Sequence, residues 1–188
     1  MNRPSRLISA QARIPRGMRA AVTGTPGVGK TTACSLVMGI PIVHVNDIVD
    51  RAHAFAGYDR KRHTKEVDVN KIKRFLKGIR GDLLIEGHLS HLLDVDVAIV
   101  LRCSPKVLER RLKKKGWNDS KIRENVEAEA IDVVLVDALE NAPLVCEIDT
   151  TNMARKQVAR AIEKIVAGES EKYPVGNVVW SQEVLSWF

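Results

Sequence analysis

Short apolar runs alternate with segments of helical periodicity along most of the chain. Runs rich in valine and isoleucine, bounded by glycine, proline or acidic residues, predict five strands. These strands cover residues 18–24, 41–45, 82–87, 95–103 and 143–150. Apolar residues at helical spacing predict a helix that follows a glycine-rich turn and ends near Gly39. Further helices are expected at 46–57, 70–81, 104–116, 119–139 and 153–168.

This alternation predicts an α/β fold with a five-stranded parallel sheet and helices on both faces. The run at 95–103 is almost entirely apolar, which is typical of a strand buried on both sides. Ser104 is expected to cap the following helix with Pro105 at its first position, and Asn46 or Asp47 to cap an earlier one. Residues 58–69 show no apolar periodicity and are expected to form a loop.

Length and composition indicate one globular domain. The chain has 188 residues, 45% of them apolar, and a domain typically has about 100–200 residues. It lacks an apolar run of the roughly 18 residues that a membrane span needs. Its odd number of widely separated cysteines, Cys34, Cys103 and Cys146, argues against a disulfide framework. We therefore expect a cytoplasmic protein with no membrane partner, in which these cysteines are small core residues.

The net charge of +7 is unevenly distributed. Residues 1–17 contain four arginines and no acid, and we treat them as a basic extension, disordered in one interpretation. Such a segment is compatible with a nucleic-acid arm, a targeting segment or an upstream start without a structural role. Met18, directly before the first strand, makes the last interpretation reasonable.

The segment "GTPGVGKT", residues 24–31, fits the phosphate-loop pattern G-x-x-x-x-G-K-[ST] at every fixed position. Gly24, Gly27 and Gly29 allow the backbone to turn tightly, so that its N–H groups point toward phosphate oxygens. The next helix adds the partial positive charge of its N-terminus. Lys30 is expected to reach the β- and γ-phosphates, and the hydroxyl of Thr31 to bind Mg²⁺. The position between a strand and a helix favours nucleotide phosphate binding, as in a P-loop NTPase, over a glycine-rich turn before an ordinary helix.

The segment "LLIEGHLSH", residues 83–91, places polar groups at the end of a buried strand. An acid at the end of a strand next to the phosphate loop faces Mg²⁺ through water, which we expect of Glu86. His88 and His91 could also share a face as zinc ligands, but a catalytic zinc needs a third protein ligand. Magnesium and phosphate are the better interpretation, with His88 as a polar or proton-handling group. His91 is expected at the surface or as a cap.

Four segments together resemble the archaeal branch of the adenylate kinase isoenzyme six family. They are "AVTGTPGVGKTT", "IEGHLSHLL", "VLRCSPKVLERRLKKKGWNDSKIRENVEAEAIDVVL" and "EIDTTN". Members of this family outside archaea include nuclear adenylate kinases that act in small-subunit ribosome maturation. The similarity extends from Met18 to about Ala167, and a weaker similarity is present in "WSQEVLSWF".

The resemblance implies a P-loop nucleoside monophosphate kinase domain at 18–168 and a C-terminal tail at 169–188. The domain would contain a monophosphate-binding (NMP) region at about 46–78 and a short lid at about 112–122. The reaction would be ATP plus AMP to two ADP with Mg²⁺. The ATP phosphates would be held by Gly24, Thr25, Pro26, Gly27, Val28, Gly29, Lys30, Thr31 and Thr32.

The resemblance also assigns residues outside the loop. Glu86 and His88 match a motif usually written with Asp and His, so Glu86 would keep the water-mediated magnesium role. Arg111 matches the arginine that enters the lid, near the adenine and phosphates, and we assign it a catalytic role with Lys30, Glu86 and His88. Arg123 lies just beyond the lid and is assigned to it together with Lys115.

Two positions depart from the family pattern. Lys115 stands where many relatives have an arginine, and it can supply charge but not the planar fork of a guanidinium. In the NMP region, relatives outside archaea have an arginine where this chain has Asp50, and Arg51 follows one residue later. Acceptor binding by Arg51 or Asp47 is accordingly a hypothesis.

Two functions are compatible with these features. The first is the adenylate kinase, and the second is an assembly factor that uses ATP binding or hydrolysis as a switch. The second would bind a small-subunit platform ribosomal protein and contact rRNA, since basic residues supply non-specific phosphate contacts. Aromatic residues make up only 4% of the chain, so direct RNA binding is the weaker prediction. A small GTPase lacks support because the sequence has no N-K-x-D element.

Overall fold

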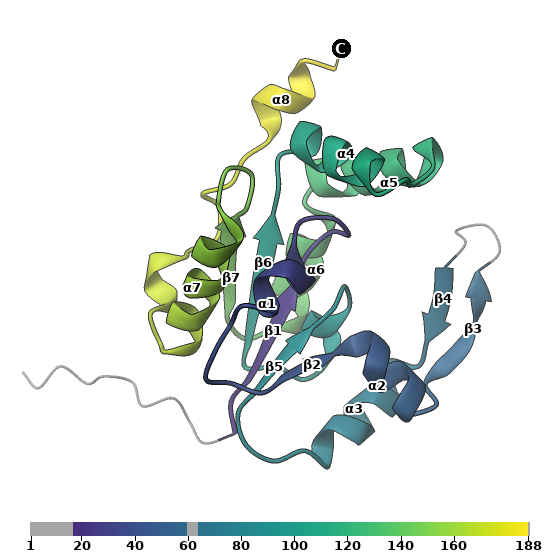
Figure 1. Ribbon diagram of the computed structural model, residues 1–188, viewed down its shortest axis with the longest axis vertical. Helices are drawn as coiled ribbons and strands as arrows, with labels where there is room; N and C mark the ends of the chain where they lie inside the picture. Colours follow the sequence, from purple (N-terminus) through teal and green to yellow (C-terminus); the bar gives the residue numbers. More distant parts are fainter. Residues whose placement is uncertain (1–16, 60–63, 188) are drawn as a thin grey trace, which may run out of the picture.

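The computed structural model describes residues 17–59 and 64–187 and contains the predicted α/β fold. Its central sheet has the order β2-β5-β1-β6-β7, with every neighbouring pair parallel (Figure 1). The strands are β1 (Arg19–Thr23), β2 (Ile42–His44), β5 (Leu83–Glu86), β6 (Val97–Arg102) and β7 (Val145–Asp149). β1 is the central strand, so the segment that follows it leaves from the middle of the sheet.

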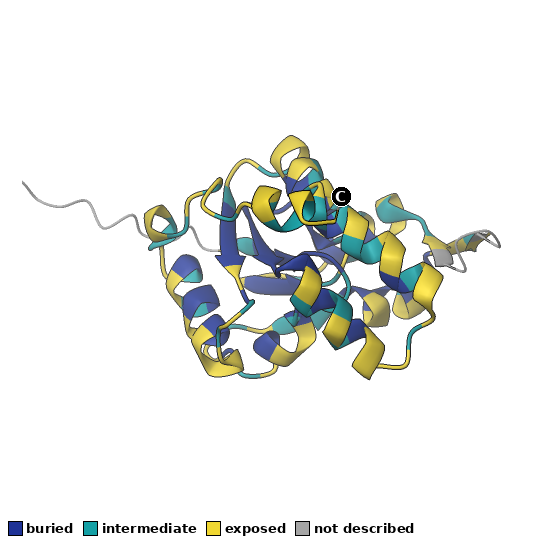
Figure 2. Ribbon diagram, turned by 90° about the horizontal axis from the view of Figure 1, so that it is seen from above, coloured by how far each residue is buried: buried dark blue, intermediate teal, exposed yellow. Residues whose placement is uncertain are grey.

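Alternate residues of the strands face two separate buried clusters, which is why the strands are almost wholly apolar. Ile99 and Leu101 pack with helices α1 (Lys30–Cys34), α4 (Pro105–Lys114), α5 (Asp119–Ala130) and α7 (Arg155–Val166). Ala98 and Val100 face the other side, with α2 (Val45–Arg51), α3 (Val69–Lys77) and α6 (Val133–Asn141). Figure 2 shows the buried strands in the middle and the exposed outer faces of the helices around them.

The sequence predicts a loop at 58–69, but 58–59 and 64–67 lie in strands, and 60–63 are outside the described residues. β3 (Phe55–Asp59) and β4 (Thr64–Val67) form an antiparallel pair that projects beside α2 and α3 (Figure 1). The preceding helix also ends earlier than expected, at Arg51, because His53 adopts a left-handed φ of 47° that an α-helix cannot contain. This helix begins at Val45 with His44 at the cap position, so neither Asn46 nor Asp47 caps it.

Two other predicted helices are shorter than expected. The helix after the phosphate loop ends at Cys34 rather than near Gly39. The helix expected at 119–139 is divided into α5 and α6 by Asp132, whose φ of 60° is left-handed. The carboxylate of Asp132 pairs with Arg102, so a tertiary ion pair accompanies the break.

The chain after α7 packs back onto the domain. It contains the 3₁₀ turn η2 (Ser170–Lys172) and the short helix α8 (Ser181–Leu185), which lies near the start of α4 (Figure 1). The N–H of Glu147 in β7 donates to the carbonyl of Tyr173 at 3.1 Å, so this segment extends the hydrogen bonding of the sheet edge.

The remaining composition-based expectations concern cysteines, membranes and the N-terminus. Cys34, Cys103 and Cys146 are free and buried, as predicted. Across residues 17–59 and 64–187, every helix is too short or too polar to cross a bilayer. The basic extension at 1–17 lies, except for Gly17, outside the described residues.

Candidate functional site: a phosphate loop between two cavities

The phosphate loop leaves the end of β1 and enters α1. Gly24, Gly27 and Gly29 all have positive φ, between 99° and 132°, which side chains other than hydrogen rarely allow. Gly24 also lies so close to β6 that a Cβ atom there would be 2.3 Å from the carbonyl oxygen of Leu101. The glycines of the sequence pattern therefore lie where the backbone φ is positive and, at Gly24, where the backbone is in close contact with the sheet.

Lys30 lies within this loop and is buried. Its ammonium group donates to the carbonyl oxygens of Gly24 at 2.7 Å and Thr25 at 3.1 Å. Burial lowers the pKa of Lys30 to about 8, while the nearby carboxylates of Glu86 and Glu129 oppose this shift. At neutral pH the side chain is still mostly charged, and a bound phosphate would stabilise that charge further.

Glu86 ends β5 beside β1, where its carboxylate meets the first turn of α1. The hydroxyl of Thr31 donates to Glu86 Oε1 at 3.1 Å, and Glu86 Oε2 lies 2.7 Å from Nδ1 of His44. A hydroxyl and a carboxylate next to a phosphate loop are hard oxygen ligands of the type that Mg²⁺ prefers. The predicted pair of Thr31 and Glu86 thus fits a magnesium ion held jointly with nucleotide phosphates.

The two histidines after β5 have different environments. His88 lies on the wall of a cavity beside the loop, and its pKa is lowered, chiefly by desolvation and then by the charge of Lys30. His91 is buried, which corrects the expectation of a surface or capping residue. Its ring nitrogens contact the hydroxyl of Thr23 at 2.8 Å and the carboxylate of Asp137 at 2.8 Å. Because both nitrogens are engaged, His91 has none left for a metal ion.

Arg111, on α4, contacts the loop through backbone oxygens. It donates to the carbonyl of Val28 at 3.2 Å and to the carbonyl of Thr150 at 2.8 Å. The hydroxyl of Thr150 lies 2.8 Å from the same Val28 oxygen. Arg111 therefore joins the lid-side helix, the phosphate loop and the segment after β7, in a position next to the predicted phosphates.

Two cavities lie on either side of the loop and share Gly27 and Lys115. The first, of about 480 Å³, is between the loop, α4 and α7, and Arg111, Thr150 and Thr32 line it. The second, of about 600 Å³, is between the loop, α2 and the end of β5, and is lined by Lys30, Thr31, Glu86 and His88 among others. The loop is thus accessible from two sides, and Lys115 of the predicted lid reaches both.

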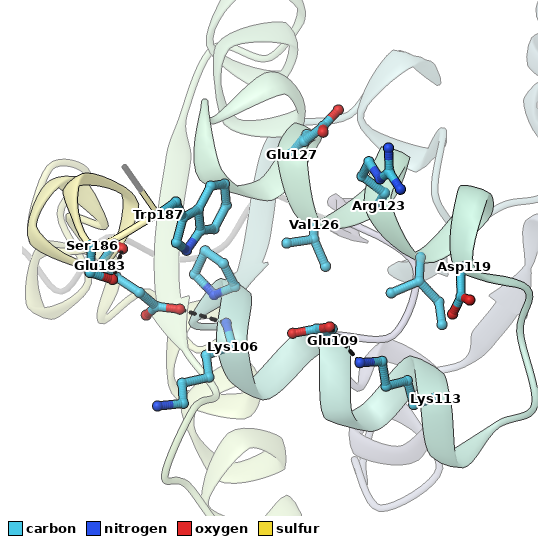
Figure 3. Close-up of a pocket in the computed structure, with 12 residues that line it drawn as sticks. Lys106, Glu109, Lys113, Asp119, Arg123, Val126, Glu127, Glu183, Ser186 and Trp187 are labelled. Carbon is cyan, nitrogen blue, oxygen red and sulfur yellow. Dashed lines mark hydrogen bonds and ion pairs between the residues drawn. The ribbon is translucent and has the colours of Figure 1, made fainter.

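Three predicted residues lie elsewhere. Asp47 and Arg51 are exposed on α2, while the neighbouring Asn46 and Asp50 line the second cavity. Arg123 lines a third cavity of about 690 Å³ between α4, α5 and the C-terminal tail, shown in Figure 3. Glu183 of the tail accepts hydrogen bonds at the start of α4, from Ser104 Oγ at 2.7 Å and the N–H of Lys106 at 2.5 Å.

Several residues of the site were not singled out from the sequence. His44 and Thr150 each stand at the end of an apolar strand, and this strand-end position is a signal that a sequence search could use. Glu129 contacts the loop from α5, 104 residues away from its partner Thr25, and local sequence gives no sign of this contact.

A five-stranded parallel sheet with a phosphate loop after its central strand defines an α/β P-loop NTPase. Residues 21–132 match a family described as AAA domain. The chain is 40% identical over 172 residues to an Archaeoglobus fulgidus protein named "putative adenylate kinase", covering 89% of this chain and 94% of that one. A Natronomonas pharaonis protein of the same name is 43% identical over 170 residues, with coverage of 89% and 100%.

The chain belongs to the family of these archaeal proteins. Its fold is also similar to that of a shikimate kinase from Acinetobacter baumannii solved in complex with shikimate. That similarity has a TM-score of 0.55 at 13% identity and covers 81% of this chain and 94% of the other. At this identity it concerns the fold alone.

Proposed function

We propose that the protein is an adenylate kinase that uses Mg²⁺ and converts ATP and AMP into two ADP. The observation that carries this proposal is the pair of cavities that meet at Gly27 and Lys115. A hydrolase needs room for one nucleotide and water, whereas transfer between two nucleotides needs two sites that meet at the moving phosphoryl group. The names of the archaeal relatives point to the same reaction.

The cavity beside α7 is the proposed ATP site. It combines the loop residues with the positive charges of Arg111, Lys114, Lys115 and Arg155, and with apolar side chains of Met153 and Val158. The charges suit a triphosphate, and the apolar side chains suit the face of a base. Of the predicted loop contacts, Gly27, Val28, Gly29 and Thr32 line this cavity, whereas Lys30 and Thr31 line the second cavity, toward which the end of the triphosphate would point. Arg111 would contact the phosphates while it holds Val28.

Mg²⁺ would be held by Thr31 directly and by Glu86 through water. When bound, the ion would offset the negative charge that develops on the phosphate oxygens during transfer. The protein has little covalent chemistry to perform in such a reaction, so its contribution is positioning and positive charge. Lys30 supplies that charge on the loop and Lys115 on the lid side.

The cavity beside α2 is the proposed AMP site. Its positive charges come from Lys30, Lys115 and Lys121, and the ammonium group of Lys121 lies 4.7 Å from the ring centre of Trp117. Asn46 and Asp50 line it from α2 and are better placed than Asp47 and Arg51 to contact an acceptor. His88 lies on its wall as a neutral polar group next to the loop.

The second candidate is the assembly factor, in which ATP hydrolysis acts as a switch on a small-subunit platform ribosomal protein and rRNA. A group of exposed apolar residues favours it, because monomeric proteins seldom expose such side chains together. They lie on and around α6: Ile131, Val133, Val136, Leu139 and Leu144. Hydrolysis that rises on adding the ribosomal protein, without AMP, would support this role.

Nucleotide chromatography after incubation with Mg-ATP, with and without AMP, tests the kinase proposal. We expect AMP-dependent loss of ATP with two ADP formed per turnover. The Lys30→Ala variant should lose turnover, since the contact to the β- and γ-phosphates is gone. Equal formation of ADP and free phosphate with and without AMP would contradict the proposal and favour the second candidate.

A further inference from the structure

A buried charge network lies behind the phosphate loop, outside both cavities. Its centre is Arg102, at the end of β6, which is 1% exposed. Arg102 Nε contacts Glu129 Oε1 at 2.7 Å, Nη1 contacts Glu147 Oε1 at 2.6 Å, and Nη2 pairs with Asp132. Buried charges of this kind persist only when hydrogen bonds satisfy them.

Glu129 connects this network to the loop. Its Oε1 accepts from Arg102 and from the N–H of Cys103 at 3.1 Å, whereas its Oε2 accepts from the hydroxyl of Thr25 at 2.5 Å. The carbonyl of Thr25 in turn accepts from Lys30. Thr25 is therefore fixed through its side chain by Glu129 and through its backbone by Lys30.

The charge balance indicates that Glu129 has a role beyond neutralising Arg102. Glu147 and Asp132 together already exceed the single positive charge of the guanidinium. A third carboxylate adds repulsion among like charges. What Glu129 provides, and the other two acids do not, is the hydrogen bond from Thr25.

We propose that Glu129 is a positioning residue for the phosphate loop. By accepting from Thr25 it holds the loop in the conformation in which Lys30 and the backbone N–H groups face the phosphates. Arg102 fixes Glu129 in turn. The C-terminal tail covers the far side of the network: Gly176 donates to Glu147 Oε2 at 3.0 Å, and the ring of Trp180 lies 5.9 Å from the guanidinium carbon of Arg102.

The test compares three variants. Glu129→Gln removes the charge at nearly constant shape, and Thr25→Val removes the hydroxyl while Arg102 keeps all its partners. Glu127→Gln is the control, since Glu127 lies two residues earlier on the same helix but is exposed and faces the third cavity (Figure 3). The dissociation constant of Mg-ADP and the steady-state constants are measured for each, with thermal unfolding.

We expect Glu129→Gln and Thr25→Val each to raise the dissociation constant and the KM for ATP about tenfold, with kcat changed much less. The double variant should be little worse than either single one, because both remove one interaction. Glu127→Gln should behave like the unchanged protein. Should Glu129→Gln fail to fold, Thr25→Val decides the question by itself.

Other results would overturn the inference. In one such result, Glu129→Gln and Thr25→Val unfold at a lower temperature but bind Mg-ADP within about twofold as tightly as the unchanged protein. Glu129 would then have a purely structural role. Another is weaker binding in Glu129→Gln but not in Thr25→Val, which would exclude the route through Thr25. The kinetic arm rests on the proposed kinase function, but the Mg-ADP affinity does not. A protein that binds Mg-ADP but lacks AMP-dependent turnover would contradict the proposed function and still allow this test.

Discussion

The chemistry of single residues in this site depends on how far each is removed from water. Lys30 is buried among backbone carbonyls and two carboxylates, and its pKa falls to about 8. His88 lies next to it and has a lowered pKa for a related reason. Lys30 can therefore lose its charge a little above neutral pH, whereas the ring of His88 is neutral there.

The alkaline limb of the pH profile should report Lys30. Only its charged form attracts phosphate, so kcat/KM for ATP, which reflects the free protein, should fall as pH rises above about 8. Bound phosphates raise the pKa of Lys30, so kcat should persist to higher pH. The guanidinium of Lys30→Arg stays charged over this range, so the residual activity of this variant should not fall with pH in the same way. A kcat/KM that is constant up to pH 9.5 in the unchanged protein would refute the assignment.

His88→Ala should slow turnover more than it weakens ATP binding. The lowered pKa of His88 keeps the ring neutral at pH 7, so it contributes polar contacts at the second cavity rather than charge to the ATP site. Steady-state kinetics and ATP titration separate the two effects. Weaker ATP binding with kcat unchanged would reduce His88 to a structural residue.

Among the helices and strands, β6 and α4 approach the phosphate loop after β1 closely and so restrict its conformation. A Cβ at Gly24 would meet the backbone of β6, and a Cβ at Gly27 would lie 2.7 Å from Leu112 of α4. The first obstacle is backbone and cannot move away, whereas the second is the end of a flexible side chain.

Gly24→Ala should therefore abolish detectable nucleotide binding and destabilise the fold. Its φ of 132° and the contact with Leu101 both oppose a side chain. Gly78→Ala is a suitable control, because its Cβ would be 3.4 Å from the nearest atom, Phe75 O, at an ordinary negative φ. Titration with Mg-ADP and thermal unfolding compare the two. Normal nucleotide affinity in Gly24→Ala would show that the close approach to β6 is not required.

The sequence predicts the elements that depend on local pattern and misses those that depend on distant contacts. The five strands and the phosphate loop follow from apolar runs and glycine spacing. The β3–β4 pair is held by hydrogen bonds between strands, in a segment whose side chains show no periodicity. The break at Asp132 involves an ion pair with Arg102, and the burial of His91 depends on Asp137 of another helix.

At the scale of the whole molecule, the Arg102 network joins the loop, both ends of the α5–α6 break, β7 and the tail. Its members are spread along the sequence from Thr25 to Trp180. The network can therefore stabilise the protein only when the whole domain is folded. Removing Arg102 would leave the buried carboxylates without their cation.

Arg102→Met should lower the free energy of unfolding by about 3–5 kcal/mol, because Glu129 and Glu147 stay buried without their cation. Arg160→Met, at an exposed position on α7, should change it by less than about 0.5 kcal/mol. Urea denaturation followed by circular dichroism measures both. Equal stability of the two variants would contradict the role assigned to the network.

In the proposed reaction, a phosphoryl group moves from one nucleotide to another between the two cavities. The most direct measurement follows the label from ATP radiolabelled at its γ-phosphate, with Mg²⁺ and unlabelled AMP present. We expect the label to appear in ADP at its β-phosphate, and only when AMP is present. Label found only in inorganic phosphate, whether or not AMP is present, would contradict the proposed reaction.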